Sequence, residues 1–145
     1  MKAIVANLSV SKSVEVYDPG GDGLYAIPGK DVIYTIEVIN LGDEINLDTI
    51  EIIDPIPPEL TLYRGAFDGT TTEPVKFIDG ATPSGLNCCT SVHLSYSTDG
   101  VVYTYQPPAD IYDATITHLK VTPSGIMSTS PAGPSFELKF RAQIK

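Results

Sequence analysis

Residues 136–144 read Phe-Glu-Leu-Lys-Phe-Arg-Ala-Gln-Ile, an unbroken alternation of apolar and polar side chains. Successive side chains of a β-strand point to opposite faces, so this alternation predicts a strand with one buried and one solvated face. The same period of two recurs in residues 8–16 and 32–38. Helical spacing is almost absent, because proline or glycine interrupts every window of a dozen residues that would carry it. The sequence therefore predicts a protein built from strands.

Turn signals divide the rest of the chain into further short strands. These are predicted at residues 50–52, 60–64, 74–78, 91–96, 101–105 and 116–121. Asp99-Gly100 stands between two strand-like runs and predicts a β-hairpin, because both residue types tolerate positive φ. The prolines that follow Asp54 end the run before them, since proline cannot donate to a central ladder. About 8–9 short strands without helices predict an all-β fold, an antiparallel β-sandwich.

The length and charge of the chain limit its organisation and its partners. Its 145 residues suit one compact domain that buries roughly two-thirds of its unfolded surface. A formal net charge of -9 repels nucleic acid and anionic lipid, so we expect neither as a partner. No stretch approaches the ~18 apolar residues of a membrane span. We predict a single sandwich domain over residues 8–145, preceded by an N-terminal extension, residues 1–7.

Two stretches carry a resemblance to a known family. Residues 27–42 contain a Pro-Gly turn, a Tyr-Thr-Ile strand and an Asn-Leu-Gly end, and residues 53–60 form an Asp-Pro-Ile-Pro-Pro corner. With the opening strand Leu8–Lys12 and the stretch 117–138, they resemble the conserved-repeat β-sandwich of prokaryotic surface proteins, catalogued as domain of unknown function 11. The resemblance implies an immunoglobulin-like sandwich displayed outside the cell, without catalytic residues.

The N-terminal residues bear on the compartment. The apolar run of residues 3–6 stops at Asn7, which is shorter than the ~7–15 apolar residues of a secretory signal core. No intact signal peptide is therefore predicted, and the chain is either cytosolic or the mature form of an exported protein. The resemblance favours the second reading, so we expect an extracellular or cell-surface location.

The same N-terminal segment is the main candidate for an interaction. It is apolar and lacks proline, so it frays, extends the first strand, or pairs as a donor strand with an open edge of a neighbouring sandwich. Head-to-tail pairing does not close, and it would build a filament. The predicted intermolecular strand consists of Ile4, Val5, Leu8 and Val10. The sequence does not predict the acceptor edge.

Two further groups of residues are candidates for ligand binding. Asp18 and Asp22 lie in a glycine-rich loop, and Asp110 and Asp113 form a second acidic pair, so either is a calcium candidate or a solvated turn. Tyrosines gather in one third of the sequence, where they pack across strands or stack on a glycan. These tyrosines are Tyr96, Tyr103, Tyr105 and Tyr112.

Residues with nucleophilic or redox chemistry are few. Cys88 and Cys89 are adjacent, so we expect two thiols or a strained vicinal disulfide, with a structural role favoured over a redox or metal role. His93 and His118 fall within predicted strands, and no nucleophile-elbow pattern surrounds a serine. We therefore expect no enzyme activity and no cofactor, with calcium as the one ion to test.

Lys12 breaks the apolar side of the first strand. It shares the parity of Leu8, Val10, Val14 and Val16. A charge at this position predicts a protected edge strand, a β-bulge, or an isopeptide bond to another strand.

Together these features predict a non-enzymatic extracellular structural protein. It would be a building block of a bacterial or archaeal cell surface, matrix or filament, with itself or other surface proteins as partners. The alternative is an adhesive module that binds a glycan, calcium or another surface protein.

Overall fold

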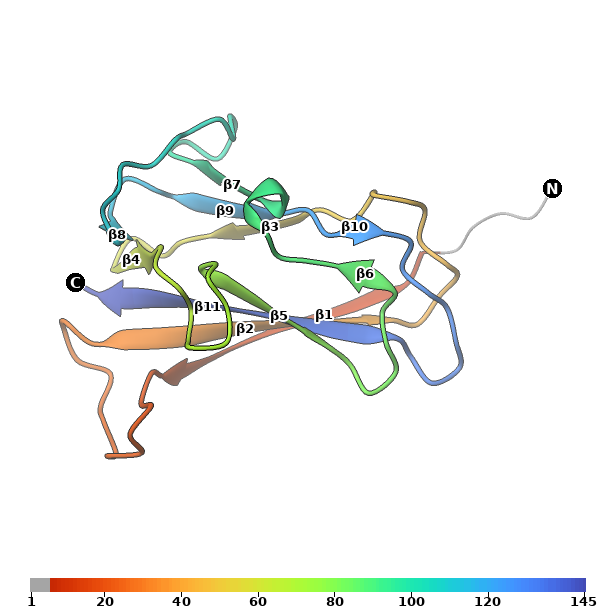
Figure 1. Ribbon diagram of the computed structural model, residues 1–145, viewed down its shortest axis with the longest axis horizontal. Helices are drawn as coiled ribbons and strands as arrows, with labels where there is room; N and C mark the ends of the chain where they lie inside the picture. The colour runs from red at the N-terminus through yellow and green to blue at the C-terminus, as the bar shows by residue number, and fades with distance from the viewer. Residues whose placement is uncertain (1–5) are drawn as a thin grey trace.

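The computed structural model describes residues 6–145 as strands joined by turns (Figure 1). Within this range the only helix is the three-residue 3-10 helix η1 (Ser91–His93). All pairings between the strands are antiparallel, so the predicted all-β antiparallel fold is confirmed. The strands are β1 (Leu8–Val16), β2 (Asp31–Asn40), β3 (Ile52–Pro55), β4 (Leu60–Tyr63), β5 (Val75–Asp79), β6 (Leu86–Asn87), β7 (Leu94–Ser97), β8 (Tyr112–Asp113), β9 (His118–Val121), β10 (Ser124–Gly125) and β11 (Ser135–Ile144).

The strands form two facing layers (Figure 1). One layer is a six-stranded sheet in the order β1-β2-β11-β4-β8, in which β5 also pairs with β11. β4 and β5 share one edge of β11, because β4 pairs with Ala142–Ile144 and β5 with Phe136–Phe140. The other layer holds the three-stranded sheet β3-β9-β7 and the short pair β10-β6.

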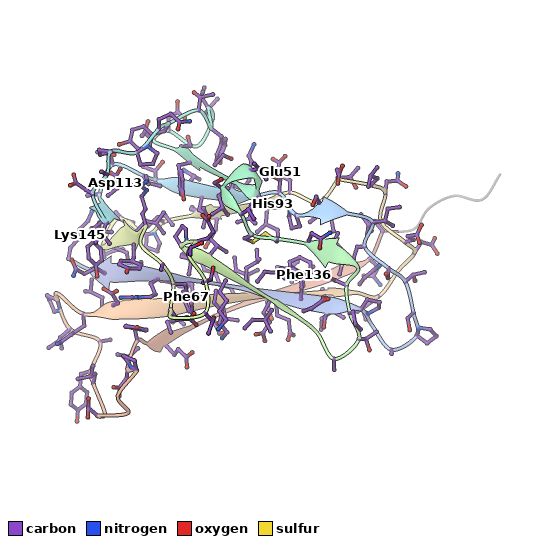
Figure 2. All side chains as sticks on the ribbon, viewed as in Figure 1. Glu51, Phe67, His93, Asp113, Phe136 and Lys145 are labelled. Atoms are coloured by element: carbon purple, nitrogen blue, oxygen red, sulfur yellow. A yellow bond between two sulfur atoms is a disulfide. The ribbon has the colours of Figure 1, made fainter. Side chains whose placement is uncertain are left out.

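The core lies between the layers and is centred on β11. Phe136 lies fully buried between the layers (Figure 2). Its ring stacks on that of Phe77 of β5, with ring centroids 5.4 Å apart. The ring of Phe140 stacks on that of Tyr34 of β2, with ring centroids 5.5 Å apart. Full burial of an aromatic or aliphatic side chain stabilises the fold by roughly 1.5–3 kcal/mol, so the alternate residues of β11 contribute much of the stability.

Eight strands have four or more residues, in agreement with the expected 8–9, and the described residues add three strands of only two residues. The predicted hairpin at Asp99-Gly100 is wrong in its second arm, because residues 101–105 form no strand. Asp99 Oδ1 accepts the N–H groups of Val101 and Val102 at 2.8 and 2.9 Å, which removes them from a ladder. The turn itself is present, with Gly100 at φ 76°.

Two strand boundaries also differ from the prediction. Residues 91–93 form η1 instead of the start of a strand, and β7 begins at Leu94. β3 continues through Pro55, which pairs with His118. This is allowed because β3 is an edge strand, and Ile56, not Pro55, donates its N–H to Thr117 O of the neighbouring chain segment at 2.7 Å.

Candidate functional site

β1 is the most exposed of the described strands, and one of its two edges is open. At its two ends, Tyr17 N–H donates to Asp31 O at 2.9 Å and Asn7 O accepts from Leu41 N–H at 2.8 Å. Alternate residues of an antiparallel strand direct their N–H and C=O groups to the same side, so the backbone groups of the odd-numbered residues of β1 are bonded to β2. The N–H and C=O groups of the even-numbered residues point away from β2, and within residues 6–145 no backbone group pairs with them. They are Leu8, Val10, Lys12, Val14 and Val16.

The same even-numbered residues also carry exposed apolar side chains. Their partners across the ladder are the inward-facing residues of β2, so they point toward the second layer. β3 is an edge strand of that layer, and among the described strands β1 packs mainly against β2. Leu8, Val10 and Val14 consequently remain 37%, 62% and 57% exposed. An apolar stripe along an unpaired strand edge is the feature by which sheets recruit further strands.

Lys12 occupies the centre of this stripe and bridges the two layers. Its Nζ lies 2.6 Å from Asp54 Oδ1 of β3 and 4.4 Å from the centre of the Tyr34 ring. The β1–β2 register is continuous from Leu8 to Val16, so Lys12 marks no bulge. The ion pair explains a charged residue on the inward face, and it draws the ammonium group away from the strand edge.

The other edges of the two layers are short or covered. β3 has four residues, and Pro55 leaves it without one N–H on the outer side. The edge of β7 is overlaid by the segment after the turn, since Tyr105 N–H donates to Tyr96 O at 3.3 Å. β5 and β8 have five and two residues. Among the described strands, β1 therefore presents the longest open edge.

Of the predicted intermolecular strand, only two residues lie in the described part of the chain. Leu8 and Val10 lie in β1, paired within the chain with Asn40 and Val38. Ile4 and Val5 lie outside the described residues. Strand donation by this segment stays a prediction, and the open edge of β1 is a candidate for the acceptor that the sequence did not predict.

The first pair of predicted calcium ligands is engaged with the backbone. Asp18 accepts the N–H groups of Asp22, Gly23 and Leu24 at 2.9, 2.8 and 3.2 Å. The bond from Asp22 is the main cause that lowers the pKa of the Asp18 carboxyl group. Asp18 thus acts as a loop-closing acceptor, and its partner Asp22 is exposed in the same loop.

The second pair is not brought together as a cation site. Asp113 accepts bonds from Thr115 and from the Tyr105 hydroxyl, while the backbone oxygen of Asp110 accepts from Arg64. Burial alone would raise the pKa of Asp113, but these hydrogen bonds to the carboxylate lower it. No cluster of three or more His, Cys, Asp or Glu side chains occurs in residues 6–145. Calcium binding stays a prediction.

Three of the four tyrosines line one pocket. Tyr96, Tyr103 and Tyr105 surround about 340 Å³ together with Arg64, whose guanidinium carbon lies 5.8 Å from the centre of the Tyr96 ring. Burial raises the pKa of Tyr96. Tyr112 lies apart from this pocket and packs on Tyr63 with ring centroids 5.2 Å apart. The pocket combines aromatic walls with a cation, which suits a polar ligand with a flat face.

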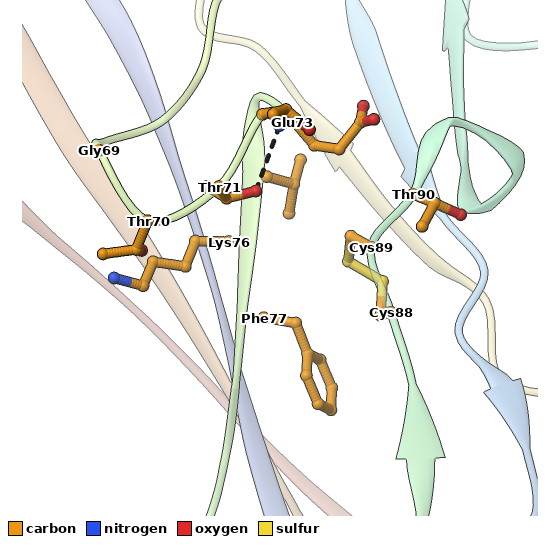
Figure 3. A pocket seen from close by; sticks show the side chains of 11 residues that line it. Gly69, Thr70, Thr71, Glu73, Lys76, Phe77, Cys88, Cys89 and Thr90 are labelled. Carbon is orange, nitrogen blue, oxygen red and sulfur yellow. Dashed lines mark hydrogen bonds between the residues drawn. A yellow bond between two sulfur atoms is a disulfide. The ribbon is translucent and has the colours of Figure 1, made fainter.

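The adjacent cysteines are joined in a disulfide, so of the two expected states the vicinal disulfide is present and the two thiols are not. A cis peptide bond places their Cα atoms 3.1 Å apart. Cys88 and Cys89 form one wall of a pocket of about 540 Å³ (Figure 3). Phe77 and Lys76 line the opposite side of this pocket, where Thr71 Oγ1 accepts from Glu73 N–H at 3.2 Å.

One histidine lies beside a serine, but with the wrong tautomer for general-base catalysis. His93 Nδ1 accepts the N–H of Thr90 at 3.0 Å, so the neutral ring carries its proton on Nε2. Nε2 lies 3.2 Å from Ser124 Oγ and therefore donates to it. A ring in this state cannot remove the serine proton. His118 is bonded through Nδ1 to Thr117.

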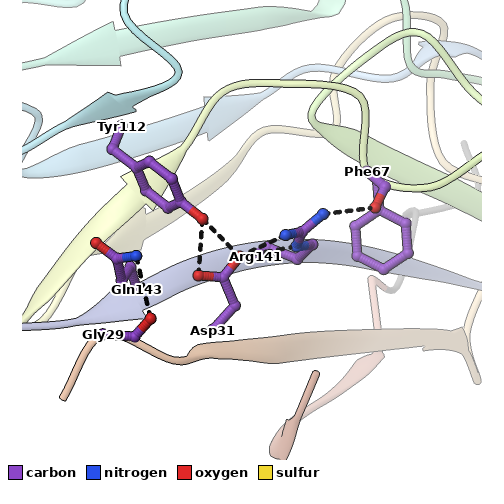
Figure 4. A network of polar contacts seen from close by, with 6 residues as sticks. All are labelled: Gly29, Asp31, Phe67, Tyr112, Arg141 and Gln143. Atoms are coloured by element: carbon purple, nitrogen blue, oxygen red, sulfur yellow. Dashed lines mark hydrogen bonds and ion pairs between the residues drawn. The ribbon is translucent and has the colours of Figure 1, made fainter. Parts of the chain in front are cut away.

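A polar network on β11 was not predicted. The guanidinium carbon of Arg141 lies 3.8 Å from the centre of the Tyr17 ring and 3.9 Å from that of the Tyr63 ring. Its Nη2 lies 2.5 Å from Asp31 Oδ2. Tyr112 donates to both oxygens of Asp31 (Figure 4). Burial, followed by this bond to Asp31, raises the pKa of Tyr112 to about 12. The network ties β8 to the strands β2 and β11, which are distant from it in sequence.

No family model, curated protein or solved structure matches the chain. Over residues 6–145 no helix has the length and hydropathy needed to cross a membrane.

Proposed function

We propose that this protein is a non-enzymatic structural protein of the cell exterior, with an immunoglobulin-like sandwich. It serves as a building block of a bacterial or archaeal cell surface, matrix or filament, and it assembles with itself by strand addition at β1. The resemblance to prokaryotic surface repeats supports the location. The open edge of β1 carries the assembly role, because it combines exposed valines with backbone groups that have no partner in residues 6–145.

The argument from the edge is energetic. Natural sheets avoid long open edges by shortening them, covering them or placing proline on them, as β3 and β7 do here. β1 has nine residues, no proline and no glycine. Its one charged inward residue is neutralised by Asp54. An edge left open in this way favours a protein that adds a strand from another chain.

Variants at Val14 test the proposal, because this residue directs its backbone N–H outward. Val14→Pro removes that donor and places a ring at the edge, while the bonds to β2 remain. We expect the wild-type protein to form dimers or larger assemblies at high concentration in light scattering and electron microscopy, and Val14→Pro to remain monomeric. Val14→Thr keeps the N–H and the branched shape, and it should assemble like the wild type. A monomeric wild type at millimolar concentration, or a proline variant that assembles normally, would contradict the proposal.

The location has its own test. Antibodies raised against the purified protein should label the surface of intact cells that encode it. Labelling that appears only after the cells are permeabilised would contradict the extracellular assignment.

The second candidate is an adhesive module that binds a glycan. The observation in its favour is the pocket of Tyr96, Tyr103, Tyr105 and Arg64. Glycan-array binding by the wild-type protein that is lost in Tyr103→Ala/Tyr105→Ala would support this role. An array without binding would contradict it.

A further inference from the structure

We infer that the strand added to β1 is β1 of a second copy, and that the two strands pair antiparallel across a two-fold axis. This inference rests on the proposed self-assembly and names its partner. A two-fold contact uses the same surface on both copies, so it closes at a dimer, which is then the unit of any larger assembly, and the surface must complement itself. The backbone, the side chains and the charge of β1 each meet that requirement.

The backbone groups match first. The five even-numbered residues of β1 each direct one N–H and one C=O outward. Two such edges placed antiparallel with Lys12 on the axis form up to ten hydrogen bonds, five donated by each copy. The six-stranded sheet then continues through both molecules without an exposed edge at the junction.

The side chains match next, because the sequence of β1 reads nearly the same in both directions from Lys12. Apolar residues stand two and four positions away on either side, and serines stand one position away on either side. The two-fold pairing therefore places Val10 opposite Val14 of the second copy, and Leu8 opposite Val16. On the other face, Ser11 lies opposite Ser13. Apolar side chains directly opposite each other on neighbouring strands stabilise a sheet.

The charge is the remaining condition, because the axis brings the two Lys12 residues opposite each other. Like charges directly opposite destabilise a strand pair. Here each ammonium group is already paired with Asp54 of its own copy at 2.6 Å and lies over the ring of Tyr34. The lysine side chain is only 35% exposed, so it does not project across the edge as a blocking charge.

Engineered cysteines test the geometry. Odd-numbered residues of the two strands form non-hydrogen-bonded pairs with Cα atoms about 4.5 Å apart, within the roughly 4.4–6.8 Å that a disulfide spans. Ser11→Cys mixed with Ser13→Cys should give a covalent dimer on mild oxidation, with a yield several-fold above that of either variant alone. The described chain holds no free thiol that would compete. Thr104→Cys, an exposed residue beside β7, is the matched control and should give no dimer.

The outcomes separate this inference from the proposed function. A preference for Ser11–Ser11 or Ser13–Ser13 dimers would shift the register by two residues and still support the two-fold pairing. Assemblies visible in light scattering without any cross-link at these serines would overturn it and favour donation by residues 1–7 or a contact elsewhere. A protein that stays monomeric in light scattering would contradict self-assembly itself.

Discussion

β1 and β11 have nearly the same sequence pattern and opposite environments. Both are long, both alternate apolar and polar residues, and both pair antiparallel with β2. Along β11, Phe136, Leu138, Phe140 and Ala142 are almost completely buried. Along β1 every residue from Leu8 to Glu15 is exposed. The difference lies in what packs on each strand: the even-numbered residues of β11 belong to the core, whereas the facing layer contacts β1 through the pair Lys12–Asp54 and leaves its apolar residues exposed.

The comparison shows that apolar–polar alternation in the sequence predicts a strand face that can be buried. It does not predict whether the same chain or another one covers that face. For β11 that surface belongs to the same chain. For β1 we propose that a second copy completes the sheet. The predictions below test this contrast, from the largest expected effect to the smallest.

The first prediction compares one apolar residue from each strand. Phe140→Ala removes a fully buried ring that packs on Tyr34, and it should lower the free energy of unfolding by about 3–5 kcal/mol. Val10→Ala should change it by less than about 0.5 kcal/mol in dilute monomer. Urea denaturation at low protein concentration measures both. Equal losses would show that the face of β1 is buried within the monomer.

The second prediction concerns the polar faces of the two strands. Asp31→Ala leaves the Arg141 guanidinium buried without its carboxylate, and it should cost about 3 kcal/mol of stability. Ser11→Ala on the outer face of β1 should be close to neutral, because this side chain is exposed. Thermal denaturation of both variants is the measurement. An unchanged melting temperature in Asp31→Ala would mean that the network on β11 contributes nothing to the stability of the fold.

The third prediction weakens the proposed pairing without changing β1. Asp54→Asn removes the charge that neutralises Lys12, so two ammonium groups would face each other across the axis. We expect a dissociation constant three- to tenfold higher, which corresponds to roughly 1 kcal/mol. Analytical ultracentrifugation of the variant, with Asp110→Asn at an exposed aspartate as the control, tests this. An unchanged constant would place Lys12 away from the interface.

The fourth prediction contrasts the open edge of β1 with the covered edge of β7. Backbone hydrogen bonds from Val102 and Val101 lower the pKa of Asp99 to about 2, from 3.8. A carboxyl group with a lowered pKa stabilises the folded turn above its unfolded pKa, and this contribution is lost as the pH falls from about 4 to about 2. NMR titration should show the amides of Val101 and Val102 shifting with a midpoint near 2. A midpoint near 4 would mean that Asp99 does not hold the turn that covers β7.

The sequence predicted the strands better than the contacts between them. Local alternation and turn chemistry were sufficient for β1, β2 and β11. The second arm at residues 101–105 was mispredicted, although the cause is local, since an aspartate in a turn competes for nearby N–H groups. The partner of Lys12 is 42 positions away and that of Arg141 is 110 positions away. No short-range pattern reports such pairs, because strand order decides them.

Amide hydrogen exchange on β1 tests the central claim most directly. In dilute solution the odd-numbered amides, such as Ser11 and Ser13, should be protected by β2, and the even-numbered amides of Val10, Lys12 and Val14 should exchange freely. At high protein concentration the even-numbered amides should become protected as well. Even-numbered amides that exchange equally fast at both concentrations would contradict strand addition at β1.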